Sequence, residues 1–384
     1  MDYLRIRRNY LALVLMTITA VSLGCEPVAG PADPNRVRDL AKEANELALS
    51  GSIPKSIKKL EKGLSILHSF QRAQRDQCYE VNCMNVLMMG IDNARIPGGE
   101  KADLYKKILS VISNYESVII KFHLFESYVR HFNSMMKPSE PEFEVSEEML
   151  STLYSQALKI AKSFEELERR GEALRDIVSG LVKTDLSEKT KRELLKATIP
   201  LLLETDTFAT QRALRRVGNV IFSQHLNAWA DLSTFRRTNG KTSIVGKIIP
   251  IYIDPERGNE ISSIYGDLPS ELRAMKPEEV GTIVLLKRPL HLAEGEYRTG
   301  GSTYGNYGGK ALRVTRSIII IHRKDREIVE EKTFRGGPPP SKILFSKGDR
   351  KIHRGSDPID EIVVYLKSLP RKKFDVVVSE SSSQ

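Results

Sequence analysis

The hydrophobic period of the chain changes once, near residues 236–240, and this change limits the fold to two kinds of structure in series. From Asn35 to about Leu232 apolar residues recur three and four positions apart and prolines are few, which predicts amphipathic helices. Beyond residue 240 the apolar residues gather in β-branched runs of strand length. We therefore predict an α+β protein, with a helical domain over residues 35–240 and a small α+β domain over residues 241–374.

One segment of the helical half carries a repeat-like pattern. Around Gly51, small and apolar residues keep helical spacing at Leu40, Ala44, Leu47, Ile53, Ile57, Leu60 and Leu64. This order resembles a tetratricopeptide repeat, in which small residues lie where two helices approach and a glycine marks the turn. A weaker copy runs over Ala157–Leu181, with Gly171 in the turn position. Because a repeat array needs about three contiguous units, we favour an irregular helical bundle and keep an irregular helical repeat region as the alternative.

Other signals in this half are local. The run Asp103–Met136 predicts one long helix or two joined helices, and Ser187 before Glu188 is a typical helix start. Trp229, the only tryptophan, is expected to be a packing anchor near the domain junction. Three histidines lack metal-ligand spacing and are expected on helix surfaces or in the core: His123, His131 and His225.

The second half is predicted to form a sheet of about four strands packed against helices. The strands are expected at Gly246–Ile253, Val280–Lys287, Leu312–Ile321 and Glu327–Phe334, the third central and the fourth nearer the edge. Helices are expected at Pro269–Ala274 and Pro358–Leu369, the latter with Asp357 as N-cap. The segment Gly336–Pro340 is interpreted as a rigid strand exit, with a polyproline recognition ligand as the alternative.

The motifs of these last 140 or so residues resemble a module of uncharacterised exported and membrane-attached prokaryotic proteins. The resemblance rests on Leu268–Ala274, Pro277–Thr282, Phe334–Pro340 and Pro358–Ile362 with Tyr365-Leu366. It implies a fold boundary near residue 240 and assigns no activity or site.

The N-terminus has the pattern of an export signal. Three arginines precede the uncharged run Tyr10–Gly24, which is short for a transmembrane helix, and Cys25 follows the small residue Gly24 directly. This order resembles the lipobox of bacterial lipoproteins, which implies a signal peptide over residues 1–24 and a lipid on Cys25. Residues 25–34, rich in proline and glycine, are predicted to be a tether. Glu26 differs from the aspartate of inner-membrane retention, which favours the outer membrane if the host has two.

The net charge limits which partners the protein can bind. The net charge is +10, with 59 basic and 49 acidic residues, and the basic residues form no run of five or six. This balance is compatible with an anionic membrane surface or acidic glycans, and it disfavours nucleic acid.

Cys78 and Cys83 lie five positions apart in a predicted helix, beyond disulfide reach unless the helix breaks, so we favour buried thiols. Residues 375–384 are predicted to be a disordered tail.

No motif predicts a cofactor, a metal site or catalytic residues. The sequence Gly305–Ala311 differs from a phosphate loop, because Tyr304 stands where the first glycine is needed and Ala311 where Ser or Thr is needed. His291, His322 and His353, with Asp325 or Asp349, could form an acid/base set only if the fold brought them together.

The segment Tyr297–Tyr307 combines tyrosines, glycines, Ser, Thr and Asn, the mixture typical of binding loops. Its candidate binding residues are Tyr297, Tyr304 and Tyr307, and an unoccupied connection is the alternative. We therefore expect a membrane-anchored envelope lipoprotein acting as a non-enzymatic interaction or scaffold protein, with a protein or glycan partner. The alternative is an envelope hydrolase or transferase with its active site in the α+β domain.

Overall fold

The computed structural model describes residues 34–70, 77–135, 145–184, 186–238, 241–298, 308–341 and 352–372. The predicted signal peptide and tail, and all of the tether but Pro34, lie outside these residues. The chain divides into two compact units, one ending at Ile96 and the other beginning at Pro97. Among the described helices, none combines the length and the apolar character needed to span a membrane.

Within its described residues the first unit contains three helices: α2 (Pro34–Leu49), α3 (Ile53–Phe70) and α4 (Gln77–Asn93). Helices α2 and α3 are joined by a tight turn at Gly51, whose φ of 77° favours glycine. The repeat-like residues of both helices form the core here, since Leu40, Ala44, Leu60 and Leu64 are all buried. Cys78 and Cys83 both belong to α4, in agreement with the predicted helix, and Cys83 is buried.

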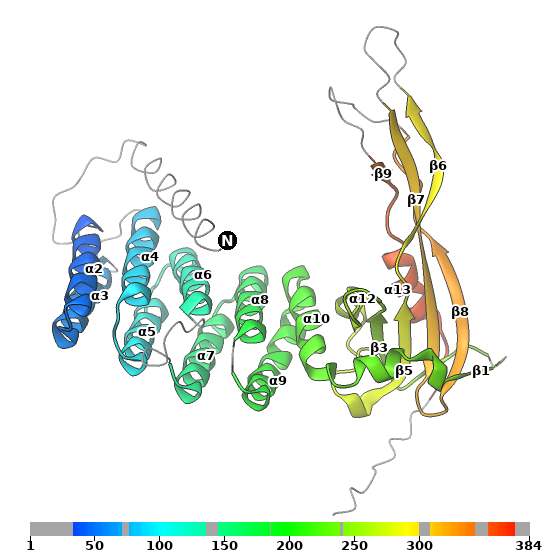
Figure 1. Ribbon diagram of the computed structural model, residues 1–384, viewed down its shortest axis with the longest axis horizontal. Coiled ribbons are helices and arrows are strands. Elements are labelled where there is room, and N and C mark those ends of the chain that lie inside the picture. The colour runs from blue at the N-terminus through cyan, green and yellow to red at the C-terminus, as the bar shows by residue number, and fades with distance from the viewer. Residues whose placement is uncertain are drawn as a thin grey trace, which may run out of the picture. The chain divides into compact units, whose positions relative to one another are not determined.

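The second unit begins with a stack of helices: α5 (Gly98–Ser113), α6 (Val118–Met135), α7 (Glu147–Lys162), α8 (Leu167–Lys183), α9 (Glu188–Thr205), α10 (Phe208–Phe222) and the short α11 (Leu226–Ala230). In Figure 1, α6, α8 and α10 form one row and α5, α7 and α9 the other. Helix α7 contacts α8 and α9, and α8 contacts α9 and α10, so packing advances by one helix at a time along the stack. The predicted helical region is thus confirmed, and its stacked packing agrees with the irregular repeat arrangement that we kept as the alternative to a bundle.

The helix boundaries mostly follow the sequence signals. The run from Asp103 divides into α5 and α6, and Ser187 caps α9 by accepting a hydrogen bond from the Thr190 N–H. Gly171, however, lies inside α8 and not at a turn. Its role is close approach, because an added Cβ would lie 2.1 Å from Oγ1 of Thr207, the N-cap of α10.

The main sheet of the described residues has eight strands in the order β1-β8-β7-β5-β3-β4, and β6 and β9 also pair with β7. Its strands are β1 (Arg236–Arg237), β3 (Lys247–Tyr252), β4 (Glu260–Ile261), β5 (Val280–Leu286), β6 (Leu290–Arg298), β7 (Gly308–His322), β8 (Glu327–Arg335) and β9 (Ile352–Arg354). A separate two-stranded sheet joins β2 (Ile244–Val245) to β10 (Arg371–Lys372).

The four predicted strands correspond to β3, β5, β7 and β8, and β7 is central as expected. The sheet is larger than predicted, because β1, β4, β6 and β9 were missed. Three of these have only two or three residues, and β6 has no β-branched residue to mark it as a strand. Strand β8 ends at Arg335, in agreement with the predicted strand exit at Gly336.

One face of the sheet packs against α12 (Ile264–Asp267) and α13 (Ile359–Ser368). The core between them contains Ile248, Val284, Ile318, Ile320, Ile362 and Leu366. The predicted helix Pro269–Ala274 is wrong: this segment is a turn whose Arg273 bridges to Ile248 of β3. Hydrogen bonds to the carbonyls of Gly266 and Leu268 hold the buried Arg273 guanidinium there, and burial lowers its pKa.

Helix α13 forms as predicted, but Asp357 is not its N-cap. Both carboxylate oxygens of Asp357 accept hydrogen bonds from Arg316 of β7, with an Nε to Oδ1 distance of 3.0 Å. The N-cap position is occupied by Pro358, which makes no side-chain cap, and the helix begins at Ile359. The carboxylate that the local sequence pattern predicted as the N-cap of α13 therefore forms an ion pair with Arg316.

The helices and the sheet of the second unit contact one another across residue 240. Arg215 of α10 donates a hydrogen bond of 2.8 Å to the carbonyl of Ile261 in β4, and Arg236 of β1 is paired with Glu327 of β8. Independent folding of residues 241–374 stays a prediction, and these contacts identify what a fragment would lose.

Candidate functional site

The predicted site residues are distributed between described and undescribed parts of the chain. Cys25, Tyr304 and Tyr307 lie outside the described residues. Tyr297 belongs to β6, although its side chain is also outside them. Strands β6 and β7 pair up to Arg298 and Gly308, so they bracket the predicted binding loop.

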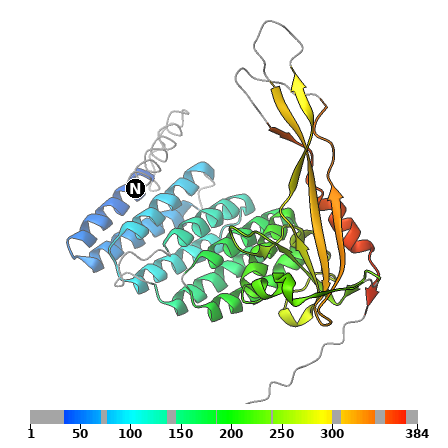
Figure 2. The same ribbon diagram turned by 45° about the vertical axis from the view of Figure 1, so that its right-hand side comes forward.

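Strand β6 forms an open edge of the sheet. Among the described strands it pairs with β7 alone, and together they extend away from the part of the sheet covered by α12 and α13 (Figure 2). Strand β5 occupies the same side of β7 farther along, over Ile318–His322. The side of β6 that faces away from β7 therefore presents backbone groups to which another strand can pair.

The register identifies those backbone groups. The carbonyl of Ser317 points to the β5 and β6 side of β7, since it accepts from the Lys287 N–H, and the carbonyl of Val314 points to the opposite side, accepting from Gly336. Odd-numbered residues of β7 thus bond to β6, and their partners include Leu290 and Leu292. The N–H and C=O groups of the intervening His291 and of Ala293 consequently face outward.

Exposed apolar side chains accompany this open edge. Leu290 is 64% exposed and Leu292 is 47% exposed, and both lie on the same face of β6 because they are two positions apart. Beyond them a bulge leaves Glu294 without a cross-strand partner in the register, and its carboxylate forms an ion pair with Arg313 of β7. The regular, apolar part of the edge is therefore Leu290–Ala293.

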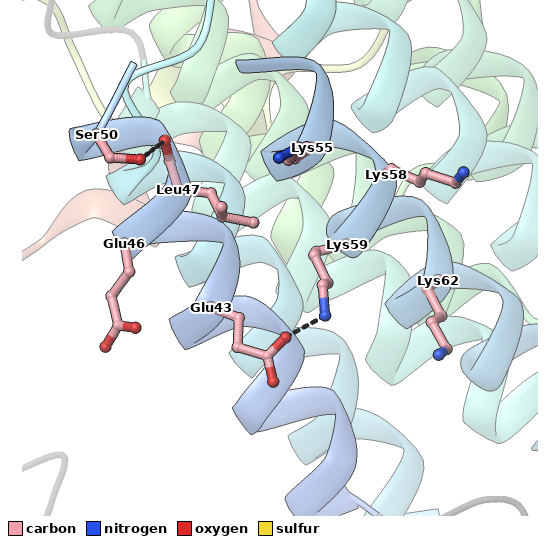
Figure 3. Close-up of a pocket in the computed structure, with 8 residues that line it drawn as sticks. All are labelled: Glu43, Glu46, Leu47, Ser50, Lys55, Lys58, Lys59 and Lys62. Carbon is pink, nitrogen blue, oxygen red and sulfur yellow. Dashed lines mark hydrogen bonds and ion pairs between the residues drawn. The ribbon is translucent and has the colours of Figure 1, made fainter. Parts of the chain in front are cut away.

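A second surface feature lies on the first unit, where α2 and α3 form a shallow groove. Figure 3 shows the lining side chains, which are Glu43, Glu46, Leu47, Ser50, Lys55, Lys58, Lys59 and Lys62. Lys59 forms an ion pair with Glu43, and its hydrogen bond and charge hold the pKa of that carboxyl below its ordinary value. Four ammonium groups beside two carboxylates make this groove suited to anions.

The predicted packing role of Trp229 is confirmed. Its buried ring lies 5.9 Å from Phe222 and 4.9 Å from His225, and the Arg323 guanidinium lies 5.0 Å from it. His322 is also buried, and its Nε2 lies 2.8 Å from the Ser243 carbonyl. Within the described ranges no three His, Cys, Asp or Glu residues are placed to hold a metal ion.

A carboxylate joins the starts of two helices in the second unit. Glu147, at the start of α7, accepts hydrogen bonds from the hydroxyls of Ser187 and Thr190 at the start of α9. These hydrogen bonds lower the pKa of Glu147. The arrangement is a structural link between neighbouring helices of the stack.

Sequence reasoning missed both surface features, although each left a signal. The alternation Leu290-His291-Leu292 has strand period, but the missing β-branched residues concealed it. The lysines of α3 follow the helical spacing i, i+3, i+4 and i+7. A search for uninterrupted basic runs does not detect charges that only a helix brings to one face.

Comparison with known proteins gives little further identification. No family model and no curated protein matches the chain. Among solved structures, the chain is similar to a Podospora anserina protein described as a kinesin light chain with nearly identical TPR-like repeats. The sequence identity is 12% and the TM-score is 0.26. The match covers 51% of this chain and 91% of that one. The described residues form a region of stacked helices followed by a sheet domain.

Proposed function

We propose that this protein is a non-enzymatic binding protein of the cell envelope, held at the membrane by a lipid on Cys25, that captures an extended segment of a partner protein along β6. The observation that carries the proposal is the open edge at Leu290–Ala293, where outward backbone groups lie beside two exposed leucines. A partner strand would pair with His291 and Ala293, and its alternate apolar side chains would cover Leu290 and Leu292.

The rest of the chain suits this role. Stacked helical repeats provide rigid, extended surfaces for protein contacts. A protein segment is favoured over a glycan as the main ligand, because an edge strand offers donors and acceptors at the spacing of another backbone. Tyr304 and Tyr307 follow β6 in the sequence, and we expect them to add aromatic contacts to the partner.

Site-specific photo-crosslinking in intact envelopes tests the binding proposal. A photoreactive residue at Leu292 should give a discrete protein adduct, whereas the same residue at Val364, 64% exposed on α13, should not. Ala293→Pro should abolish the adduct without lowering the melting temperature, because the lost N–H faces outward and is not part of the ladder with β7. Equal adducts from both positions, or an adduct that survives Ala293→Pro, would contradict capture along β6.

Metabolic labelling with a fatty-acid analogue tests the anchor separately. We expect Cys25→Ala to abolish incorporation while the melting temperature stays unchanged, because the thiol is the proposed acyl acceptor. Equal incorporation into the variant and the parent protein would remove the basis for anchorage at Cys25.

A further inference from the structure

Helix α3 presents a stripe of lysines to solvent. Lys55, Lys58, Lys59 and Lys62 line the groove beside α2, and Figure 3 shows their side chains spaced along α3. Lys55, Lys58 and Lys62 are exposed, and the described residues give them no ion pair. We call these four residues the α3 lysine stripe.

The α3 lysine stripe retains most of its charge. Of the two carboxylates in the groove, Glu43 forms an ion pair with Lys59, and the Glu46 side chain points away from the lysines in Figure 3. The groove therefore keeps an excess of positive charge, which attracts polyanionic surfaces.

An apolar residue lies at the end of the same hairpin. Leu49, the last residue of α2, is 71% exposed, and the turn that follows it leads directly into α3 and Lys55. Basic residues beside an exposed leucine are the combination by which helices bind the interface of an anionic bilayer.

The position of the stripe in the chain points to one such surface. Cys25 precedes Pro34, the first residue of α2, by nine positions. Nine residues span at most about 30 Å even when fully extended. If Cys25 carries the acyl chains, α2 and α3 are confined close to the headgroups of the same membrane.

We propose that the α3 lysine stripe binds the anionic headgroups of the membrane that holds the lipid anchor, so that the α2–α3 hairpin lies on the bilayer surface. The proposal rests on the anchorage at Cys25 proposed above. It adds a second membrane contact, electrostatic in origin and sensitive to salt, which fixes how the first unit is held at the surface.

Vesicle co-sedimentation tests the stripe without the lipid. The probe is the chain Glu26–Gln384, which retains every described element and lacks Cys25, with vesicles of phosphatidylcholine containing 30% phosphatidylglycerol. The test variant is Lys55→Gln, Lys58→Gln, Lys62→Gln, which leaves the Lys59 to Glu43 ion pair in place. The control replaces three exposed lysines of the second unit by Gln, with the same change in net charge: Lys159, Lys162 and Lys196.

Each basic residue near an anionic surface strengthens binding by roughly fivefold, so the test variant should lose at least about tenfold in vesicle affinity. The control should bind like the parent chain, and binding should disappear on vesicles of phosphatidylcholine alone or at high salt. Melting temperatures should agree, because Gln is as favourable in a helix as Lys.

Two outcomes would overturn the proposal: equal affinity of the test and control variants, or equal binding of the parent chain to neutral and anionic vesicles. Neither depends on lipidation, since Cys25 is absent from the probe. If the parent chain does not bind the vesicles but Cys25 is labelled normally, headgroup binding by the α3 lysine stripe is rejected and lipidation of Cys25 is retained. Failure of labelling with stripe-dependent binding would reject the anchor and leave the headgroup contact.

Discussion

Gly171 offers a direct test of how the helical stack is packed. It lies in α8, where an added Cβ would meet Oγ1 of Thr207 at 2.1 Å, its Cβ at 3.3 Å and its Cγ2 at 3.5 Å. Thr207 is buried and caps α10 through a capping box with Thr210, so it has little freedom to move away. We therefore expect Gly171→Ala to destabilise the second unit, although alanine is the better helix former.

The magnitude follows from three contributions. Overpacking of a well-filled site costs about 1–3 kcal/mol, and disturbing the Thr207 cap costs about 1 kcal/mol more. Replacing glycine by alanine inside a helix recovers about 0.5–1 kcal/mol. The free energy of unfolding should fall by about 1–3 kcal/mol, which appears as a lower denaturant midpoint at constant slope.

Urea unfolding followed by tryptophan fluorescence measures this change, because Trp229 is the only tryptophan and lies buried in the second unit. Gly99→Ala is the matched control: this glycine is also helical, and an added Cβ would lie an ordinary 3.6 Å from Met149. Repeating Gly171→Ala in a Thr207→Gly background removes the obstructing side chain. There the substitution should be neutral or stabilising, and an unchanged cost in that background would refute the explanation by close approach.

Three further predictions concern pH, domain structure and the tyrosine loop. Hydrogen bonds lower the pKa of Glu147, so the stability that its carboxylate contributes is present above the ordinary value of 4.5 and is lost as pH falls through the lower folded-state pKa. Glu147→Gln should therefore have a lower melting temperature than the parent protein at pH 7 and the same melting temperature at about pH 2. An equal difference in melting temperature at both pH values would contradict this. A fragment from Lys241 to Gln384 should unfold cooperatively but at a lower temperature than Pro97–Gln384, because it loses β1 and the α10 contacts; no transition in calorimetry would reject a separate domain. Replacing Tyr304 and Tyr307 by Ala should weaken the Leu292 crosslink and leave the melting temperature unchanged, and a large fall in that temperature would identify them as core residues.

The sequence alone determined the elements whose signals are local. The three- and four-residue spacing of apolar side chains predicted the helices, because a helix must bury one continuous stripe. The run Ile318–Ile321 predicted a central strand, since apolar residues on both faces need neighbours on both sides. The open edge itself could not be predicted in this way, because whether a strand has one neighbour or two depends on the arrangement of the whole sheet.

Tertiary structure decided the rest wherever a distant partner outweighed the local preference. Asp357 pairs with Arg316 and does not cap α13. Residues 269–274 form a turn and not a helix, and Arg273 of this turn bridges to Ile248 of β3. Gly171 resembles a turn residue in sequence, yet the approach of α10 accounts for it. The α3 lysines were visible as spacing, but only the packing of α2 against α3 settles which charges meet a carboxylate and which remain exposed. Contacts between residues far apart in sequence leave no periodic trace, so they emerge only when the chain is folded.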